Sequence, residues 1–235
     1  MHSVALLTTD THHHRYFARE ISSRVRSLEI IIETSRVLPG FEVDHPYEAD
    51  RDEYEREILL GGDRVKFDDL GATLSVGRAN DALAVARLRS YAPDIIVAFG
   101  TRFLKKDVIN IARVACVNLH GGDPTAYRGL DSHLWAIYHK DFGALVAALH
   151  HVDLELDTGD LVEQNAVPLK HGMELHELRS ENTRVCVELV SRMLARDDSS
   201  IPRHPQRGKG RYYSFMPTCL KELCVNRFRE YARSL

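Results

Sequence analysis

The chain has 235 residues, enough for one sizeable core or for a main domain with a small appendage. Its 31 basic and 34 acidic residues leave a net charge of only -3, so no overall positive field exists to gather nucleic acid or an anionic membrane. We therefore expect neither as a partner, and we expect ligands to be recognised locally.

Short apolar runs alternate with amphipathic stretches along the first half of the chain. The apolar runs at 4–8 and 28–33 are predicted strands, and the segment 14–25 between them is a predicted helix. Residues 50–60 predict an exposed, charged helix that two glycines end. This alternation is typical of a parallel sheet with helices on both faces.

The same alternation continues to about residue 152. A helix over 79–91, with Asn80 as its cap, precedes a break at Pro93. The elements that follow are a strand at 94–100, a short helix near 105–112, a strand at 114–120, a helix that begins at Asp131 or Ser132, and a strand at 144–152. Because such crossovers are right-handed, we expect consecutive strand ends to emerge at one edge of the sheet.

The C-terminal part has a different pattern. Residues 174–194 predict an amphipathic helix, and residues 203–217 combine turn residues with basic and aromatic ones, which suggests a hairpin or loop. The stretch DDSSIP at 197–202 is the only plausible linker. We predict a three-layer, Rossmann-like, mostly parallel α/β domain over 1–168 and a small helix-plus-hairpin extension over 169–235.

The cysteines and the N-terminal residues indicate in which cellular compartment the protein is expected. Four cysteines show neither a C-x-x-C spacing nor the density of a disulfide scaffold, which favours reduced thiols and argues against structural zinc. The start MHSVALLTTD is too short for a signal peptide and lacks its basic flank. We expect a cytoplasmic protein without a bound metal.

A polar pair stands where a predicted buried strand ends. Asn118 and His120 are two positions apart on an extended strand, so their side chains share one face. An amide beside a protonated imidazole can donate two hydrogen bonds to a carbonyl oxygen that becomes an oxyanion. A carboxylate at a neighbouring strand end would orient the imidazole, and Asp157 is the best placed candidate. A simpler interpretation is that the pair only satisfies strand-end backbone groups.

These residues carry a resemblance to a known family. Its elements, in chain order, are the Asn-x-His pair, Tyr127-Arg128-Gly129, and LDTGD at 156–160 before an apolar strand. From about 92 to 168 the chain resembles the folate-dependent formyltransferases, which act on glycinamide ribonucleotide, methionyl-tRNA or nucleotide sugars. The first 90 residues resemble the family only in their strand and helix rhythm.

The resemblance implies roles for particular residues. Asn118 and His120 would hold the formyl oxygen of the co-substrate 10-formyltetrahydrofolate, and Asp157 would assist His120 and proton movement through water. The pterin would lie between two loops, Phe99-Gly100-Thr101-Arg102-Phe103 and Asp153-Leu154-Glu155-Leu156.

The acceptor amine follows from differences within the family. Only 67 residues of the 235 follow Pro168, which is short for the RNA-binding barrel of methionyl-tRNA formyltransferases. The stretch TTDTHHHRYF has no glycine where glycinamide ribonucleotide enzymes place a phosphate loop. We therefore expect a dTDP-, UDP- or GDP-linked amino-dideoxy sugar, as in O-antigen biosynthesis. The expected acceptor contacts are Tyr127, Arg128, Gly129, His13 and Arg15, with Arg211 or Tyr212 as further candidates.

Other interpretations stay open. Transfer to another amine, namely glycinamide ribonucleotide, methionyl-tRNA or a peptide or amino-acid amine, would use the same residues. A formyltetrahydrofolate hydrolase would use water as acceptor, and a non-catalytic sensor would bind without turnover. The segment RGKGRYY is either a solvated hairpin or a contact of a homodimer. The common H-P-S-L-L-P pattern is replaced by H-G-G-D-P, so the acceptor side of the site differs from that of relatives.

Overall fold

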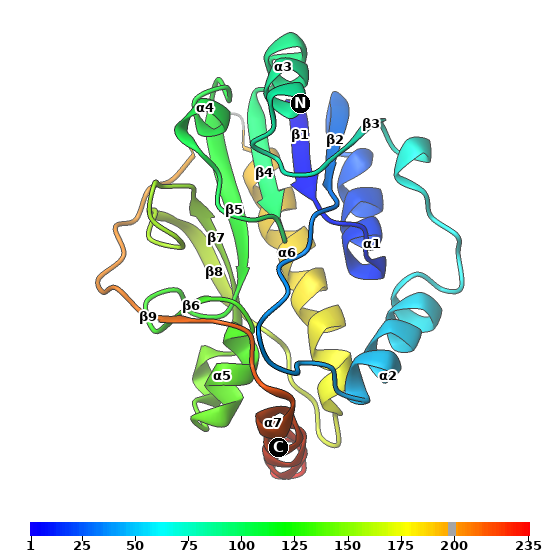
Figure 1. The fold of residues 1–235 in the computed structure, drawn as a ribbon, viewed down its shortest axis with the longest axis vertical. Coiled ribbons are helices and arrows are strands. Elements are labelled where there is room, and N and C mark those ends of the chain that lie inside the picture. The colour runs from blue at the N-terminus through cyan, green and yellow to red at the C-terminus, as the bar shows by residue number, and fades with distance from the viewer. Residues whose placement is uncertain (197–200) are drawn as a thin grey trace.

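A seven-stranded sheet forms the centre of the computed structural model, which describes residues 1–196 and 201–235 (Figure 1). Its strands are β1 (Ser3–Thr8), β2 (Ser27–Glu33), β3 (Ala72–Val76), β4 (Ile95–Phe99), β5 (Ala115–Gly121), β7 (Val146–His151) and β8 (Leu161–Ala166). The strand order is β3-β2-β1-β4-β5-β7-β8. The first five are parallel, and β7 is antiparallel to both β5 and β8. The predicted mostly parallel α/β fold is confirmed.

Helices cover both faces of this sheet and create two cores. On one face lie α1 (His12–Ser22) and α6 (Leu178–Leu194), and on the other α3 (Ala82–Tyr91) and α4 (Lys106–Ile109). Leu6 packs in the core beneath α1 and α6, whereas Leu7 packs in the core beneath α3 and α4. Successive strand side chains point to opposite faces, so a strand covered on both sides is an unbroken apolar run.

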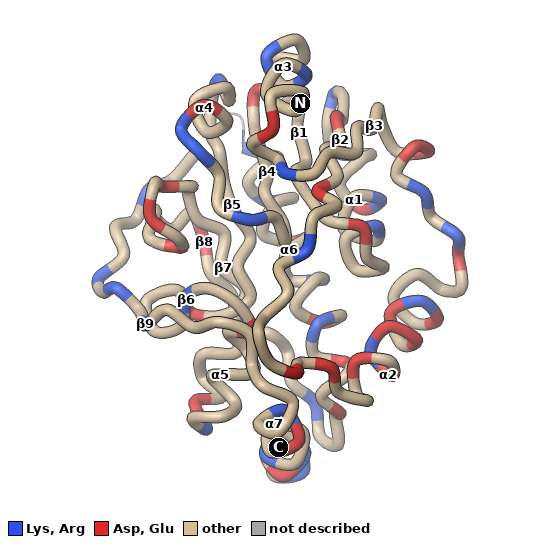
Figure 2. Tube along the Cα trace, viewed as in Figure 1, with Lys and Arg blue, Asp and Glu red and all other residues tan. Residues whose placement is uncertain are grey.

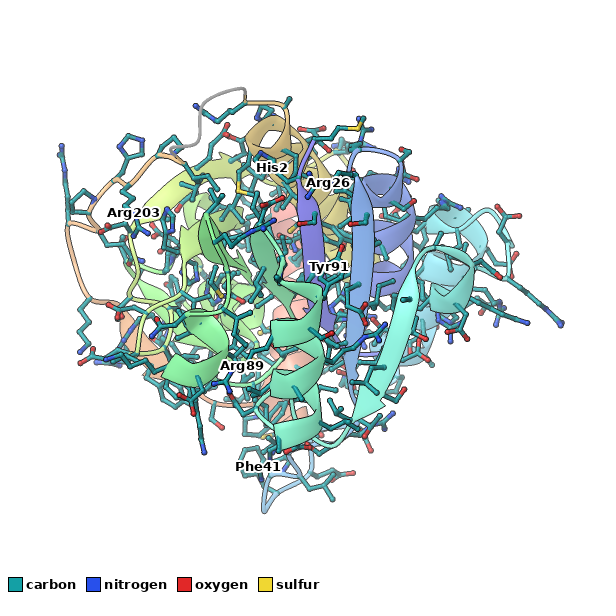
Figure 3. All side chains as sticks on the ribbon, turned by 90° about the horizontal axis from the view of Figure 1, so that it is seen from above. His2, Arg26, Phe41, Arg89, Tyr91 and Arg203 are labelled. Atoms are coloured by element: carbon teal, nitrogen blue, oxygen red, sulfur yellow. The ribbon has the colours of Figure 1, made fainter. Side chains whose placement is uncertain are left out.

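The two edges of the sheet differ. At the amino ends of the strands, the Arg26 backbone N–H donates to the His2 carbonyl oxygen at 2.8 Å, and the Ser27 and Tyr91 hydroxyls are 2.7 Å apart. Figure 3 views this end and shows His2, Arg26 and Tyr91 close together. These bonds tie the amino ends of the strands together, whereas ligands of open α/β sheets usually bind at the carboxyl edge.

The C-terminal region corrects one expectation. The expected hairpin does not form within residues 203–217, because β9 (Arg211–Tyr213) pairs in parallel with the distant β6 (Tyr127–Gly129). Helix α7 (Thr218–Ala232) then packs on α5 (Ser132–Tyr138) through a separate apolar cluster. The C-terminal segment is therefore joined to a loop at the carboxyl edge.

The boundary predicted at residue 168 stays a prediction. Helix α6 packs on α1 and on strands β7 and β8 of the main sheet, whereas α7 packs on α5. The two long helices that follow residue 168 thus contact different parts of the fold. In the linker predicted at 197–202, residues 197–200 lie outside the described residues.

The connection between β2 and β3 passes in front of the sheet (Figure 1). It contains α2 (Tyr47–Tyr54), which continues as a π-helical turn over Glu55–Leu59, so the helix predicted over 50–60 begins earlier and changes type. Figure 2 shows acidic residues concentrated on α2, while both signs are mixed over the rest of the trace. Within the described ranges, no helix is long and apolar enough to cross a membrane.

Candidate active site

Asn118, His120 and Asp157 meet at the carboxyl edge of the sheet. The first two end β5, and Asp157 lies in the loop between β7 and β8. Asn118 Nδ2 is 3.5 Å from Asp157 Oδ1, and His120 Nδ1 is 3.6 Å from Asp157 Oδ2. Because β7 is antiparallel to β5, its last residue His151 pairs with Val117, and the loop after β7 turns back to bring Asp157 beside Asn118 and His150.

All three side chains line a cavity of about 710 Å³, a volume typical of small-molecule sites. The other sequence-predicted site residues that line it are Phe99, Gly100, Thr101, Arg102, Phe103, Asp153, Glu155, Gly129 and His13. Five predicted residues do not line it, namely Leu154, Tyr127, Arg128, Arg15 and Arg211. The cavity thus joins the two loops that we expected around the pterin with the catalytic candidates.

Asp157 is buried and ionised. Burial raises its pKa. His120, His150 and the Gly129 N–H together lower it by more than burial raises it, and the resulting pKa is about 2. The Gly129 N–H donates to Asp157 Oδ2 at 2.9 Å. The backbone of Asp157 is left-handed, with φ of 54°, which is uncommon for a residue with a Cβ atom. The carboxylate is therefore held in place by its neighbours.

The low pKa of Asp157 predicts a pH dependence of stability. Because its folded pKa of about 2 is below the usual 3.8, the carboxylate contributes stability above about pH 3.8, which is lost as the pH falls toward 2. The contribution should be about 2 kcal/mol. We expect the unfolding free energies of wild type and Asp157→Asn, measured in urea, to differ less near pH 2 than near pH 6. A difference that does not change with pH would contradict this assignment.

His120 differs from the sequence-based expectation in its charge. Burial lowers its pKa, an effect only partly opposed by the attraction of Asp157, so the imidazole is neutral at neutral pH rather than protonated. Its Nε2 lies 2.9 Å from the Tyr127 carbonyl oxygen, to which a proton on that nitrogen is donated. A neutral imidazole carries a single N–H, so His120 can donate to an oxyanion only when its Nε2 exchanges the Tyr127 carbonyl oxygen for the substrate oxygen.

His150 is a fourth polar residue of this cluster. Its Nδ1 lies 2.8 Å from the His151 carbonyl oxygen, so the proton belongs there and Nε2 is free to accept. The Asn118 amide donates to that Nε2 at 3.1 Å. His151 points the other way, with Nε2 3.1 Å from the Pro202 carbonyl oxygen. Because neighbouring residues of a strand point to opposite faces, only one of His150 and His151 can face the cleft. The sequence alone does not show which of the two it is.

The loop after β4 has the form of a ligand-binding turn. Gly100 has φ of 80°, and a Cβ atom there would lie 2.4 Å from Cε1 of His14. Asn80, which we expected to cap α3, instead donates to the Phe103 carbonyl oxygen at 2.7 Å, and Asp81 is the cap. Among the described residues, the buried Thr101 hydroxyl has no hydrogen-bond partner. This loop therefore offers a fixed backbone and a free polar atom to the cavity.

Arg128 braces two loops instead of lining the cavity. Its Nε donates to the Gly210 carbonyl oxygen at 2.6 Å and its Nη1 donates to the Leu156 carbonyl oxygen at 3.1 Å. Gln206 acts similarly, because its amide donates to the carbonyl oxygens of Asp157 at 3.1 Å and Gly159 at 2.7 Å. The C-terminal segment thus fixes the loop that carries Asp157.

The remaining predicted contacts outside the cavity have partners of their own or face solvent. The Tyr127 hydroxyl donates to Asp141 at 3.1 Å, and Arg15 Nε donates to Asp10 at 2.6 Å. Leu154 is exposed at the surface. Tyr127 and Arg15 thus bond to protein groups in this structure, and their contact with an acceptor stays a prediction.

Some residues of the histidine run at 12–14 and of the candidates on β9 line the cavity, and others do not. His13 and His14 are buried and line the cavity, with ring centroids 3.9 Å apart, whereas His12 does not line it. On β9, Tyr212 lines the cavity and Arg211 does not. Within residues 1–196 and 201–235, no group of three or more His, Cys, Asp or Glu residues is placed to hold a metal ion.

Comparison with known proteins identifies the family of this fold and site. A family model described as formyl transferase matches residues 66–193, more than half of the chain. The chain belongs to the formyl transferase family. The match extends beyond the stretch from about 92 to 168 on which the sequence resemblance was based, and it confirms that resemblance.

Curated relatives are methionyl-tRNA formyltransferases. The chain is 27% identical over 161 residues to the enzyme of Clostridioides difficile, covering 67% of this chain and 51% of the relative. It is 35% identical over 104 residues to that of Clostridium acetobutylicum, covering 42% and 33%. The chain therefore spans about half or less of the length of the curated relatives that it matches.

Solved structures share the fold at low sequence identity. A 4-N formyltransferase from Francisella tularensis superposes with a TM-score of 0.59 at 18% identity, covering 90% of this chain and 76% of that one. A sugar N-formyltransferase from Shewanella gives 0.58 at 13%, covering 95% and 86%. HypX from Aquifex aeolicus, in complex with tetrahydrofolic acid, gives 0.59 at 17%, covering 98% and 34%. At these identities the comparison establishes the fold.

Proposed function

We propose that this protein transfers the formyl group of 10-formyltetrahydrofolate to the amine of a dTDP-, UDP- or GDP-linked amino-dideoxy sugar. The observation that carries the proposal is the contact of Asn118 and His120 with Asp157 at 3.5 and 3.6 Å, beside a cavity of about 710 Å³. Membership of the formyl transferase family supports the reaction type. The sugar N-formyltransferase from Shewanella, which has the same fold, supports the acceptor class.

The two loops expected around the pterin fit a polar, planar ligand. Residues 99–104 and most of 152–157 line the same cavity, and the unpartnered Thr101 hydroxyl can bind a ring nitrogen or oxygen. HypX, which shares this fold, was solved in complex with tetrahydrofolic acid, and this supports folate as the co-substrate here. Backbone groups of the Gly100 loop would supply further hydrogen bonds, since its positive φ fixes their direction.

Each catalytic candidate has a distinct part in the transfer. The uncharged amine forms a bond to the formyl carbon, and the carbonyl oxygen gains a negative charge. The Asn118 amide stabilises that charge, and so does the single N–H of His120 once Nε2 turns from the Tyr127 carbonyl oxygen to the substrate oxygen. The bond from the formyl carbon to folate N10 then breaks, and the proton lost by the amine ends on N10.

Asp157 acts through its charge. As the amine attacks, its nitrogen becomes positive, and an ionised carboxylate favours that state. A group with a pKa of about 2 is a weak base, so it passes the proton to water and onward to N10 rather than holding it. Its contact with His120 also keeps the imidazole oriented toward the substrate.

A panel of acceptors tests the proposal. Amino-dideoxy sugars on dTDP, UDP and GDP would each be incubated with the protein and 10-formyltetrahydrofolate, and products read by mass. We expect at least one sugar to gain a single formyl group, because the cavity holds the complete catalytic set.

The same assay includes its controls. Reactions without folate should give no mass change, and reactions without amine should release no formate. Formate release without an amine would indicate a hydrolase instead. Formylation of methionyl-tRNA or glycinamide ribonucleotide, with no sugar modified, would show that the acceptor assignment is wrong.

A further inference from the structure

Two polar side chains flank the glycine that follows His120. A Cβ atom at Gly121 would lie 3.3 Å from Cε1 of His133 on α5 and 3.6 Å from Nδ2 of Asn182 on α6. Gly121, His133 and Asn182 all line the cavity together with His120.

His133 presents a hydrogen-bond acceptor to this cluster. Its Nε2 lies 2.8 Å from the Val146 carbonyl oxygen, so the proton resides on Nε2 and the lone pair on Nδ1. Burial lowers the pKa of His133 to about 4, and the ring is therefore neutral at neutral pH. No described residue donates a hydrogen bond to Nδ1.

Asn182 lacks the partners that a buried amide normally has. Only 5% of the residue is exposed, yet Oδ1 has no hydrogen-bond partner among the described residues. Its Nδ2 makes one long contact, 3.7 Å to Cys186 Sγ. A buried amide usually finds a partner, because leaving it unpaired is costly. With no strong bond to hold it, the amide can turn to present either end to a ligand.

The arginine of α6 that lines the cavity is already neutralised. Arg179 donates to Glu55 at 2.5 and 2.8 Å and to Asp52 at 3.1 Å, and Glu55 is fully buried. Arg179 is thus occupied by carboxylates and is not available to a phosphate. Since His133 is also neutral, this cluster suits an uncharged ligand that is rich in hydrogen-bond donors.

From these contacts we propose that His133 and Asn182 form the acceptor subsite, which binds N–H and O–H groups of an uncharged amino-sugar ring. The inference rests on the proposed function and adds the residues that select the acceptor. A sugar ring offers several hydroxyl donors, and a site with buried unpaired acceptors rejects analogues that lack them. The phosphates of the carrier would lie elsewhere along the cavity.

Paired substitutions test this subsite. His133→Phe and Asn182→Leu remove the acceptors with little change in size, whereas His133→Gln retains an amide that can donate to Val146 and still accept. With a dTDP-linked 4-amino-4,6-dideoxy sugar as probe, we expect KM for the sugar to rise about tenfold in the first two variants. We expect His133→Gln to stay within about threefold of wild type, by the same conversion.

A folate measurement separates loss of the subsite from loss of folding. The Kd of 5-formyltetrahydrofolate, followed by protein fluorescence, should be unchanged in all three variants. Unchanged sugar KM in both His133→Phe and Asn182→Leu would overturn the proposal. An equal loss in His133→Gln and His133→Phe would also overturn it, because the loss would then not depend on the acceptor that His133→Gln retains.

A binding measurement distinguishes this inference from the proposed function. In protein with ¹⁵N-labelled histidine, millimolar glucosamine should shift the His133 Nδ1 resonance in wild type but not in Asn182→Leu. If no nucleotide sugar is formylated but this shift is seen, the subsite stands and the acceptor assignment fails. If sugars are formylated and wild type shows no shift, the subsite is wrong and the function stands.

Discussion

Asp157→Asn should lower kcat/KM for formyl transfer by about 10³-fold. The substitution keeps the shape of the side chain but removes the charge that faces His120 at 3.6 Å and His150 at 3.5 Å. It also weakens the bond from the Gly129 N–H, which an amide oxygen accepts less strongly than a carboxylate. Steady-state kinetics with 10-formyltetrahydrofolate and the best sugar of the panel would measure the loss.

Asp160 provides the matched control. It lies three residues further on, is partly exposed, and pairs at 3.8 Å only with the exposed Arg203. We expect Asp160→Asn to keep kcat/KM within about twofold, since exposed ion pairs contribute little. Near-normal turnover of Asp157→Asn would refute the assigned role, and so would an equal loss in Asp160→Asn.

Gly129→Ala should reduce the free energy of unfolding by about 3 kcal/mol. Gly129 has φ of 96°, and a Cβ atom there would lie 2.2 Å from the Tyr213 carbonyl oxygen. That oxygen belongs to the backbone of β9 and cannot move without breaking the β6–β9 pairing. Urea denaturation followed by circular dichroism would give the difference in stability.

The exposed Gly208 serves as the comparison for this substitution. A Cβ atom at Gly208 would meet only the Thr125 carbonyl oxygen at 3.7 Å, an ordinary contact. We expect Gly208→Ala to change stability by less than about 0.5 kcal/mol. If both alanine variants had wild-type stability, the close approach of β9 to Gly129 would be refuted.

Elements buried on both faces could be predicted from sequence because their side chains leave a local pattern. β4 is an unbroken apolar run and β1 is apolar over residues 4–7, and the structure buries every residue of both strands. The edge strand β3 was not predicted, since it is largely exposed and its composition carries no such run. The pairing of β6 with β9 joins two three-residue strands far apart in the chain, so local periodicity does not reveal it.

In the candidate site, too, local spacing in the sequence predicted only those arrangements that involve residues close together in the chain. Asn118 and His120 are two residues apart, so strand geometry alone placed them together. The role of Arg128 as a brace depends on Gly210, 82 positions away, and no local signal distinguishes it from a phosphate ligand. His133 and Asn182 meet only because α5 and α6 both approach Gly121, which requires the tertiary structure.

The bonds from Gln206 and Gly210 to the loops around Asp157 and Arg128 have a consequence for biosynthesis. A polypeptide still being translated can contain every catalytic side chain and yet lack the segment that fastens their loops. Enzymatic competence should therefore arise only after the segment that contains Gln206 and Gly210 has left the ribosome. Carboxyl-terminal truncation before residue 206 would give a chain that folds its sheet but remains inactive.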